Sequence, residues 1–344
     1  MFYVFTLNES RIGARTSVSL YFPRLLFAVC MIFFLTPILG YIHIASFSHD
    51  QFSSHLFNKE PDSSTANSSS DSIMTYVYNA PESPQDVRYL YHWEILRTAL
   101  EKTKAKFGPY RMMPSEFMTE KRQAYELIHR TGKLSVMYLS TIPEFEKNLI
   151  PIRIPVDKNL GGYCIFLIRK EQQKEFDAIQ TIDDLRKFSY GLGLGWIDVD
   201  ILKSNHFNVV TGSNYDGLFE MLVNNRFDIF LRAAVEIIDE YKQRKDKFPD
   251  LYIEKNLILY YPLPMYFWFS KTDEGKRLAV RAEEGMRIMI KDGTYDHIFD
   301  RYQRDKIEEL QLQHRRIFTI QNPFLGPETP LNDQQLWFNP KTYK

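Results

Sequence analysis

The clearest strand–helix–strand pattern of this chain lies at residues 188–213, which read FSYGLGLGWIDVDILKSNHFNVVTGS. Apolar residues cluster in 188–194 and again in 208–211, as they do in strands that are covered on both faces. Between these two runs, residues 199–205 carry apolar side chains at helical spacing. Strand, helix and strand in this order predict a unit of two parallel strands joined by a helix.

The same alternation extends to both sides of this stretch. We expect strands at 73–79, 110–113, 134–139, 149–156, 163–169, 188–194, 208–211, 227–231 and 265–270. We expect helices at 92–106, 119–131, 182–187, 199–205, 215–225, 234–245, 273–291 and about 295–316. The pattern predicts an α/β protein whose mostly parallel sheets are flanked by helices. Two such blocks, linked by extended crossings near 154–168 and 262–270, predict two lobes joined by a two-strand hinge.

Composition excludes some classes of function. The 344 residues include 43 basic and 43 acidic side chains, so the formal net charge is zero. A general nucleic-acid binder needs a basic face, and we expect no nucleic-acid partner. Of the two cysteines, Cys30 lies in an N-terminal apolar run and only Cys164 lies in the remainder of the chain, so no internal disulfide is predicted there.

The N-terminus has the pattern of an export segment. Arg11, Arg15 and Arg24 precede the apolar run 25–42, and positive charge before such a run orients it for export. We predict a signal peptide or membrane anchor over 1–48 and a disordered Ser-rich linker over 49–72. The protein is then expected in the periplasm, either free or anchored in the inner membrane through 25–42. A buried core helix is the alternative for this run.

Several short motifs occur in a fixed order. They are Ile182-Asp183-Asp184-Leu185, Tyr190-Gly191-Leu192-Gly193, Phe219-Glu220-Met221-Leu222, Arg226-Phe227-Asp228 and Asp292-Gly293-Thr294-Tyr295. Together they resemble the family 3 solute-binding proteins of the type 2 periplasmic class, which include amino-acid receptors of import systems. Pro151-Ile152-Arg153-Ile154-Pro155 and Asn322-Pro323-Phe324 resemble an uncharacterised bacterial branch of that family. The resemblance covers about residues 73–318.

The resemblance implies a two-lobed periplasmic-binding-protein fold of type 2. Lobe 1 would comprise 73–165 and 265–318, lobe 2 would comprise 166–264, and 319–344 would form an extended C-terminal tail. The chain departs from the family at the helix after the first strand, where Tyr91-His92-Trp93-Glu94-Ile95-Leu96 replaces a G-F-D-x-D stretch. The arginine that clamps an amino-acid carboxylate in lobe 1 cannot be placed. The resemblance therefore supports the fold more strongly than it supports a particular ligand.

Ligands of open α/β sheets bind beyond the carboxyl ends of the strands, so the candidate site residues are those in the turns that follow the strands. In lobe 1 these are Tyr78 and Thr141. The alternative is that both residues simply lie in solvent-exposed surface loops. In lobe 2, Trp196 could stack on the ligand or fill the core. Asp198 could face the ligand or act as the N-cap of the next helix.

Further candidates follow the later strands of lobe 2. Ser213 and Tyr215 open a helix and could cradle an anion, although capping by Ser213 or Asn214 explains the turn as well. Arg232 could hold a ligand carboxylate or phosphate with Glu236 beside it, or the two could form an internal ion pair at i, i+4. Arg153 could point into the cleft or brace the hinge.

No enzyme motif stands out. The chain has no G-x-S-x-G and no H-E-x-x-H, and its eight histidines are scattered, so we assign no catalytic residue, metal or cofactor. We expect a monomeric binding protein that captures a small polar ligand, such as an amino acid or related carboxylate, and delivers it to a membrane permease or a sensor protein. The alternatives are a membrane-tethered sensory or interaction module of the same fold and a degenerate enzyme.

Overall fold

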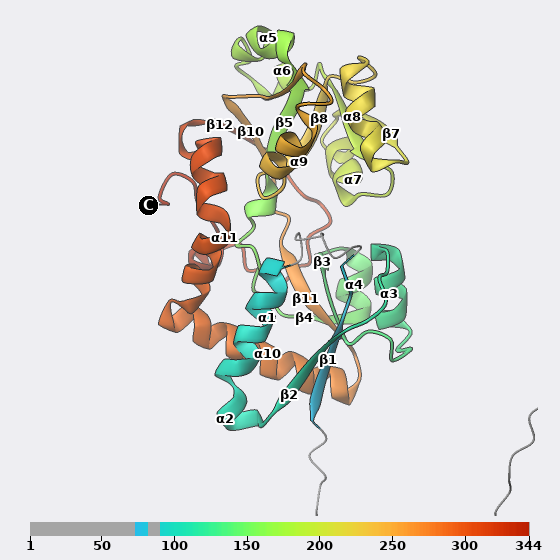
Figure 1. Ribbon diagram of the computed structural model, residues 1–344, viewed down its shortest axis with the longest axis vertical. Coiled ribbons are helices and arrows are strands. Elements are labelled where there is room, and N and C mark those ends of the chain that lie inside the picture. The colour runs from blue at the N-terminus through green and yellow to red at the C-terminus, as the bar shows by residue number, and fades with distance from the viewer. Residues whose placement is uncertain (1–72, 82–89, 344) are drawn as a thin grey trace, which may run out of the picture. The chain divides into compact units, whose positions relative to one another are not determined.

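The computed structural model describes residues 73–81 and 90–343, which belong to one compact unit spanning 68–344 (Figure 1). The predicted signal or anchor at 1–48 and the linker at 49–72 lie outside the described residues. Among the residues that are described, no helix combines the length and the apolar character that a membrane span requires.

A two-stranded sheet and a three-stranded sheet organise the first lobe. Their strands are β1 (Met74–Tyr78), β2 (Tyr110–Pro114), β3 (Val136–Ser140), β4 (Leu149–Pro151) and β11 (Met265–Ser270). β1 pairs with β2 in parallel, and β11 pairs in the antiparallel sense with both β3 and β4. β1 lies next to β3, since the N–H of Ser135 donates to the carbonyl of Val77 at 2.9 Å. The order across the lobe is therefore β2-β1-β3-β11-β4.

A seven-stranded sheet organises the second lobe. Its strands are β5 (Tyr163–Arg169), β6 (Ser189–Gly193), β7 (Asn208–Gly212), β8 (Ile229–Ala233), β9 (Leu251–Ile253), β10 (Leu257–Tyr260) and β12 (Arg316–Thr319). β6 pairs in parallel with β7 and β8, and β5 runs antiparallel to β8, β9 and β10. β12 closes one edge by pairing in parallel with β10.

The two lobes share one strand order although their sequences do not repeat. The order β7-β6-β8-β5-β10 of the second lobe matches β2-β1-β3-β11-β4 of the first. In each lobe the fourth strand is reversed, and it follows a passage between the lobes: β5 follows the first crossing (152–162), and β11 follows the second crossing (261–264). The α/β class and the two lobes are confirmed. The sheets are less parallel than expected: the β1-β2 sheet is parallel, the β3-β11-β4 sheet is antiparallel, and the sheet of the second lobe is mixed.

Helices flank the sheets of both lobes (Figure 1). The first lobe carries α1 (Leu90–Lys102), α2 (Lys104–Phe107), α3 (Glu120–Ile128), α4 (Pro143–Asn148) and α10 (Asp273–Asp292). The second carries α5 (Gln173–Asp177), α6 (Ile182–Leu185), α7 (Ile197–Ser204), α8 (Tyr215–Val223) and α9 (Ile237–Arg244), and α11 (Thr294–Leu310) follows α10. Thr181 caps α6: its hydroxyl accepts from the N–H of Asp184 at 3.2 Å, and the Asp184 carboxylate accepts from the N–H of Thr181 at 3.0 Å.

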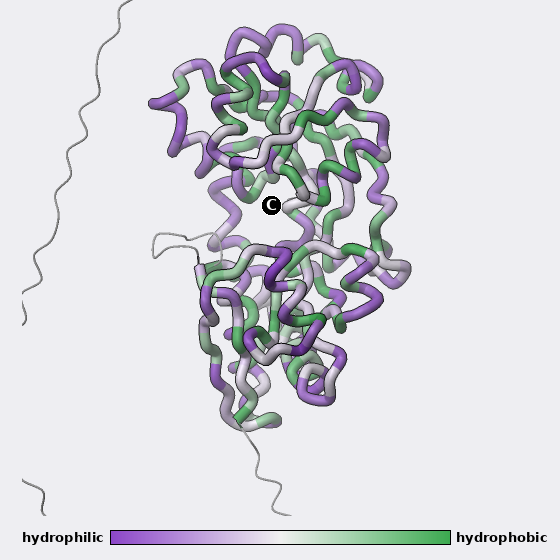
Figure 2. The backbone as a smooth tube through the Cα atoms, turned by 90° about the vertical axis from the view of Figure 1, so that its right-hand side faces the viewer, coloured by the Kyte–Doolittle hydropathy of each residue, from purple (hydrophilic) through white to green (hydrophobic). Residues whose placement is uncertain are grey.

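Apolar segments gather inside each lobe, and hydrophilic loops lie outside them (Figure 2). The largest cluster of buried side chains also includes residues of the first crossing. Ile152, Val156 and Leu160 are fully buried there. The hydroxyl of Tyr91 donates to the carbonyl of Val156 at 2.6 Å, and the hydroxyl of Tyr295 donates to the same carbonyl at 2.8 Å. The first crossing is thus a packed part of the core.

Among the differences from the expected elements, three affect the architecture. The predicted strand 149–156 ends at Pro151, and α4 was not foreseen. The last helix ends at Leu310 instead of about residue 316, because Gln311 adopts a left-handed conformation with φ 51°. Residues Arg316–Thr319 form β12 in the sheet of the second lobe. The domain boundaries stay predictions, and β12 favours moving the end of lobe 1 from residue 318 to the turn at Gln311.

Candidate functional site

A buried ion-pair cluster lies at the end of β8. Arg232 is 8% exposed, and its Nη2 lies 2.6 Å from Glu236 Oε2 and 2.5 Å from Glu240 Oε1, while Nε donates to Glu240 Oε2 at 2.7 Å. Burial alone would lower the pKa of Arg232, but the two carboxylates outweigh it and raise that pKa. The internal pair with Glu236 is therefore formed. With Glu240 included, the three side chains carry a net charge of −1.

Two aromatic rings enclose this cluster. The Arg232 guanidinium lies 4.9 Å from the ring centroid of Trp196 and 5.7 Å from that of Tyr215. The Tyr215 hydroxyl donates to Glu240 Oε1 at 2.5 Å. Burial is the main cause that raises the pKa of Tyr215, so this hydroxyl stays protonated near neutral pH. The ends of β6, β7 and β8 thus bring Trp196, Tyr215 and Arg232 into one group.

The turn after β6 places the Trp196 ring. A β-carbon on Gly193 would lie 2.3 Å from Trp196 Cε2, so only glycine admits the indole ring at this point. Gly195 has φ +88°, a conformation that side chains disfavour. Of the two roles considered for Asp198, the N-cap is not observed, because Trp196 holds the cap position of α7 and Asp198 lies in its first turn. The Asp198 carboxylate instead accepts from the hydroxyl of Tyr261, on the second crossing.

The turn after β7 is capped by Asn214. Its Oδ1 accepts from the N–H of Gly217 at 2.8 Å, so capping of α8 is observed and Asn214 is the residue that provides it. Ser213 is exposed and lines a shallow hollow along α8 together with Glu220 and Arg226. This hollow presents one acidic and one basic side chain, so its lining has no excess of positive charge for an anion.

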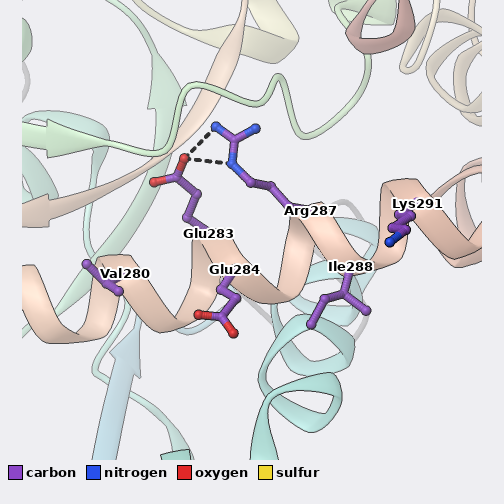
Figure 3. A pocket seen from close by; sticks show the side chains of 6 residues that line it. All are labelled: Val280, Glu283, Glu284, Arg287, Ile288 and Lys291. Carbon is purple, nitrogen blue, oxygen red and sulfur yellow. Dashed lines mark hydrogen bonds and ion pairs between the residues drawn. The ribbon is translucent and has the colours of Figure 1, made fainter. Parts of the chain in front are cut away.

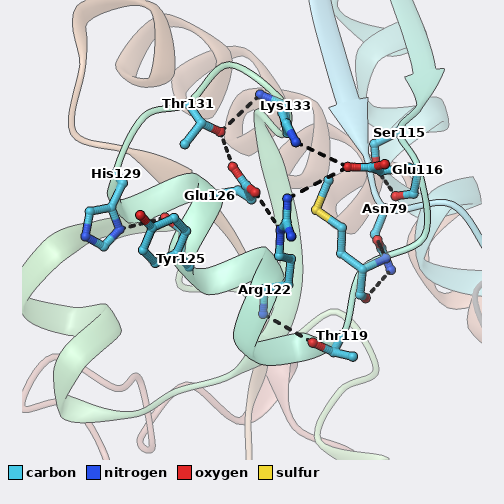
Figure 4. A network of polar contacts seen from close by, with 11 residues as sticks. Asn79, Ser115, Glu116, Thr119, Arg122, Tyr125, Glu126, His129, Thr131 and Lys133 are labelled. Atoms are coloured by element: carbon cyan, nitrogen blue, oxygen red, sulfur yellow. Dashed lines mark hydrogen bonds and ion pairs between the residues drawn. The ribbon is translucent and has the colours of Figure 1, made fainter.

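In the first lobe, the turn after β1 is held by paired contacts. Tyr78 lies against Trp93, with ring centroids 4.8 Å apart. Trp93 is 7% exposed and its indole N–H has no hydrogen-bond partner. Asn79 accepts from the N–H of Met118 at 2.8 Å and donates to its carbonyl at 3.2 Å, which ties this turn to the loop before α3 (Figure 4).

Thr141 and Arg153 meet at one carboxylate. Thr141 is fully buried, and its hydroxyl donates to Glu146 Oε1 at 2.7 Å. Arg153 donates to both oxygens of Glu146, at 3.1 and 2.7 Å, and its Nε donates to Glu328 at 3.0 Å. Arg153 therefore braces the first crossing, which is the second of the two roles considered for it.

Helix α3 presents a polar network beside this region (Figure 4). The hydroxyl of Thr131 donates to the Glu126 carboxylate, and Arg122 Nε donates to it at 2.6 Å. The Thr131 hydroxyl and then Arg122 hold the pKa of Glu126 below its usual range. At the start of α3, Lys121 Nζ lies 3.8 Å from the position of a β-carbon on Gly195. The two lobes therefore approach each other at Lys121, away from the crossings.

Other features of the described chain offer no convergent site. No group of three His, Cys, Asp or Glu side chains suited to a metal ion occurs among residues 73–81 and 90–343. A second hollow lies on α10 and is lined by side chains of that helix alone, including the Glu283–Arg287 ion pair at 2.6 Å (Figure 3).

The structure brings together Trp196, Tyr215, Arg232 and Glu236. Tyr78, Thr141, Arg153, Asp198 and Ser213 have the separate partners described above, and their convergence with the first group on one groove stays a prediction. Sequence reasoning missed Glu240. A signal was present, since Glu236 and Glu240 are four residues apart and such residues share a helix face.

No family model matches this chain, and no curated protein sequence is similar to it. Solved structures are similar at low identity. One is an ancestral arginine-binding protein bound to arginine, with 19% identity and a TM-score of 0.47, covering 67% of this chain and 98% of that one. Another is the substrate-binding protein of an amino acid ABC transporter, with 14% identity and a TM-score of 0.45, covering 68% and 100%. A third is the GluR0 ligand-binding core of Nostoc punctiforme in complex with L-glutamate, with 12% identity and a TM-score of 0.44, covering 67% and 98%.

Proposed function

We propose that this chain is an exported solute-binding protein that captures a small polar ligand between its two lobes, for uptake or for sensing. The observation that supports this most is the group of Trp196, Tyr215 and Arg232 at the ends of three neighbouring strands. Ligands of open α/β sheets bind beyond such strand ends, and two lobes can enclose them by closing.

The charge of this group narrows the ligand class. Two carboxylates already neutralise Arg232 and leave a net charge of −1, so a further anion at Arg232 would be repelled. Aromatic faces beside carboxylates instead suit an ammonium group, which is attracted by both. We propose that an amine of the ligand faces Glu236, Trp196 and Tyr215. A ligand carboxylate, as in an amino acid, would then point away from Arg232.

The test is a thermal-shift screen of the full chain against amino acids, polyamines, sugars and organic acids. Ligand at about 100 times its Kd should add about 2.7 kcal/mol to stability and raise Tm. We expect amine-bearing compounds to respond. Glu236→Gln should weaken that response, whereas the control Glu171→Gln, an exposed ion-pair variant of the same lobe, should retain it. The proposal fails if every class leaves Tm unchanged, and the amine assignment fails if Glu236→Gln responds like the unmodified protein.

A second candidate is a membrane-tethered sensory or interaction module of the same fold. The observation that favours it is the packing of the first crossing, whose side chains at Ile152, Val156 and Leu160 are fully buried. A hinge so packed resists the closure that ligand capture uses. Under either candidate, the partner would be a membrane permease or a sensor protein and the chain a monomer, and a degenerate enzyme would require turnover of a bound ligand.

A further inference from the structure

The C-terminal segment 320–343, which we name the strap, contacts both lobes and both crossings. It begins beside the second lobe, where the N–H of Ile320 donates to the carbonyl of Tyr260 at 2.9 Å. Asn322 is 7% exposed, and its Nδ2 donates to the carbonyl of Pro262 in the second crossing at 2.9 Å. The first part of the strap is therefore attached to lobe 2 and to the second crossing.

The middle of the strap rests on the first lobe. Glu328 forms an ion pair with Arg153 at 2.8 Å, and Arg153 is also bound to Glu146. Gly326 is buried against Glu146, since a β-carbon on Gly326 would lie 2.2 Å from Glu146 Oε1. The middle of the strap is thus held by the carboxylate and guanidinium that brace the first crossing.

The end of the strap returns across the first crossing. The N–H of Phe338 donates to the carbonyl of Lys158 at 2.7 Å, and the hydroxyl of Tyr163, at the start of β5, donates to the carbonyl of Phe338 at 2.9 Å. The Phe338 ring is buried against Phe299 of α11, with centroids 5.9 Å apart. The hydroxyl of Tyr343 donates to Asp300 of α11 at 2.6 Å, beside the end of the chain in Figure 1.

A hinge movement rotates the lobes about the two crossings by changing backbone torsions there. Because one segment is attached to lobe 2, to lobe 1 and to both crossings, such a rotation must stretch or break some of its contacts. We infer that the strap holds the lobes at one separation and that the Arg153–Glu328 pair is its releasable contact. Glu328 is the exposed partner, with 74% of its side chain accessible, so this contact can open without exposing the core.

This inference concerns the resting geometry of the lobes and goes beyond the proposed function, because it holds whatever the ligand. The experiment is pulsed electron–electron distance measurement on the full chain without ligand. Spin labels are placed at Lys174→Cys in lobe 2 and Arg277→Cys in lobe 1, both exposed positions. The substitution Cys30→Ser removes one of the two native cysteines, and the other, Cys164, is buried. The distance distribution of this protein should show one narrow peak.

Glu328→Gln combined with Asn322→Ala should broaden or shift the distribution. The matched control Glu283→Gln, which breaks a surface ion pair within α10, should leave it unchanged. Distributions that superimpose for the strap variant and its parent would overturn the inference. If the double variant does not fold, the test uses Glu328→Gln alone and measures amide hydrogen exchange in residues 152–162. Exchange that is faster than in the control Glu283→Gln supports the role of the strap. Equal exchange in the two variants refutes it.

Discussion

Asp157 in the first crossing makes the stability of the folded protein depend on pH, and the surroundings of its side chain set the size of this effect. The side chain is 4% exposed, and its two oxygens accept from the N–H groups of Asn159, at 3.0 Å, and of Gly161, at 2.8 Å. Burial raises the pKa of this carboxyl from 3.8 to about 6, against the opposing effect of the two N–H groups. The folded protein therefore binds a proton at Asp157 more tightly than the unfolded chain does.

The sign follows from linkage. Between the unfolded and folded pKa values, from 3.8 to about 6, the folded state holds more protons, so the free energy of unfolding falls as the pH rises through this range. Below this range both states are protonated at Asp157, and above it both are ionised. At about 1.4 kcal/mol per pKa unit, the ionised carboxylate costs about 3 kcal/mol of stability near pH 7.

The assay is urea unfolding of the protein and of Asp157→Asn at a series of pH values from 4 to 7.5. The difference between the two free energies of unfolding isolates this residue, because the other titrating groups are shared. We expect Asp157→Asn to gain about 2.5 kcal/mol relative to the parent as the pH rises across the series, because the unfolded carboxyl is already partly ionised at pH 4. Asp157→Ala should show the same slope with a constant loss, since two N–H groups lose their acceptor. A difference that stays flat across the series would refute the reasoning.

Three further predictions concern the second lobe, each checked by urea unfolding. Arg232→Met should cost about 3–5 kcal/mol, because it leaves the buried carboxylate of Glu240 without its cation, and adding Glu240→Gln should recover part of the loss; equal stability of the single variant and the parent would contradict this. Gly193→Ala should cost about 1–3 kcal/mol, because its methyl group displaces the Trp196 ring, and an unchanged stability would show that the ring moves freely. Thr181→Ala should cost about 1 kcal/mol through the lost cap, whereas Thr181→Ser should restore most of it.

Local features were predictable where neighbouring residues suffice. The strand at 163–169 is apolar at every position before its last residue, Arg169, and its predicted bounds match β5. Thr181 caps α6, and such a cap depends only on residues within one helical turn. The end of α11 was not predictable in this way: Gln311 has no turn-forming side chain, and the helix stops where β12 can pair with β10.

The contacts of the candidate site also divide into local ones, which the sequence indicates, and long-range ones, which it does not. The pairing of Arg232 with Glu236 was one of two roles open from their spacing, and the structure forms it. The bond from Tyr215 to Glu240 joins residues 25 positions apart, on α8 and α9, and no local pattern indicates it. Arg153 could brace the hinge or face the cleft from its sequence alone, and Glu328, on the strap, is the residue that engages it.

The amino-acid order by itself determined the alternation of strands and helices and the division into two blocks, because hydrophobic periodicity acts over a few residues. Only the tertiary structure decided that one reversed strand enters each lobe across a crossing, that both lobes share one strand order, and that the last residues bind the hinge. These contacts join segments far apart in the chain, and their free energy depends on surfaces that exist only after both lobes have formed.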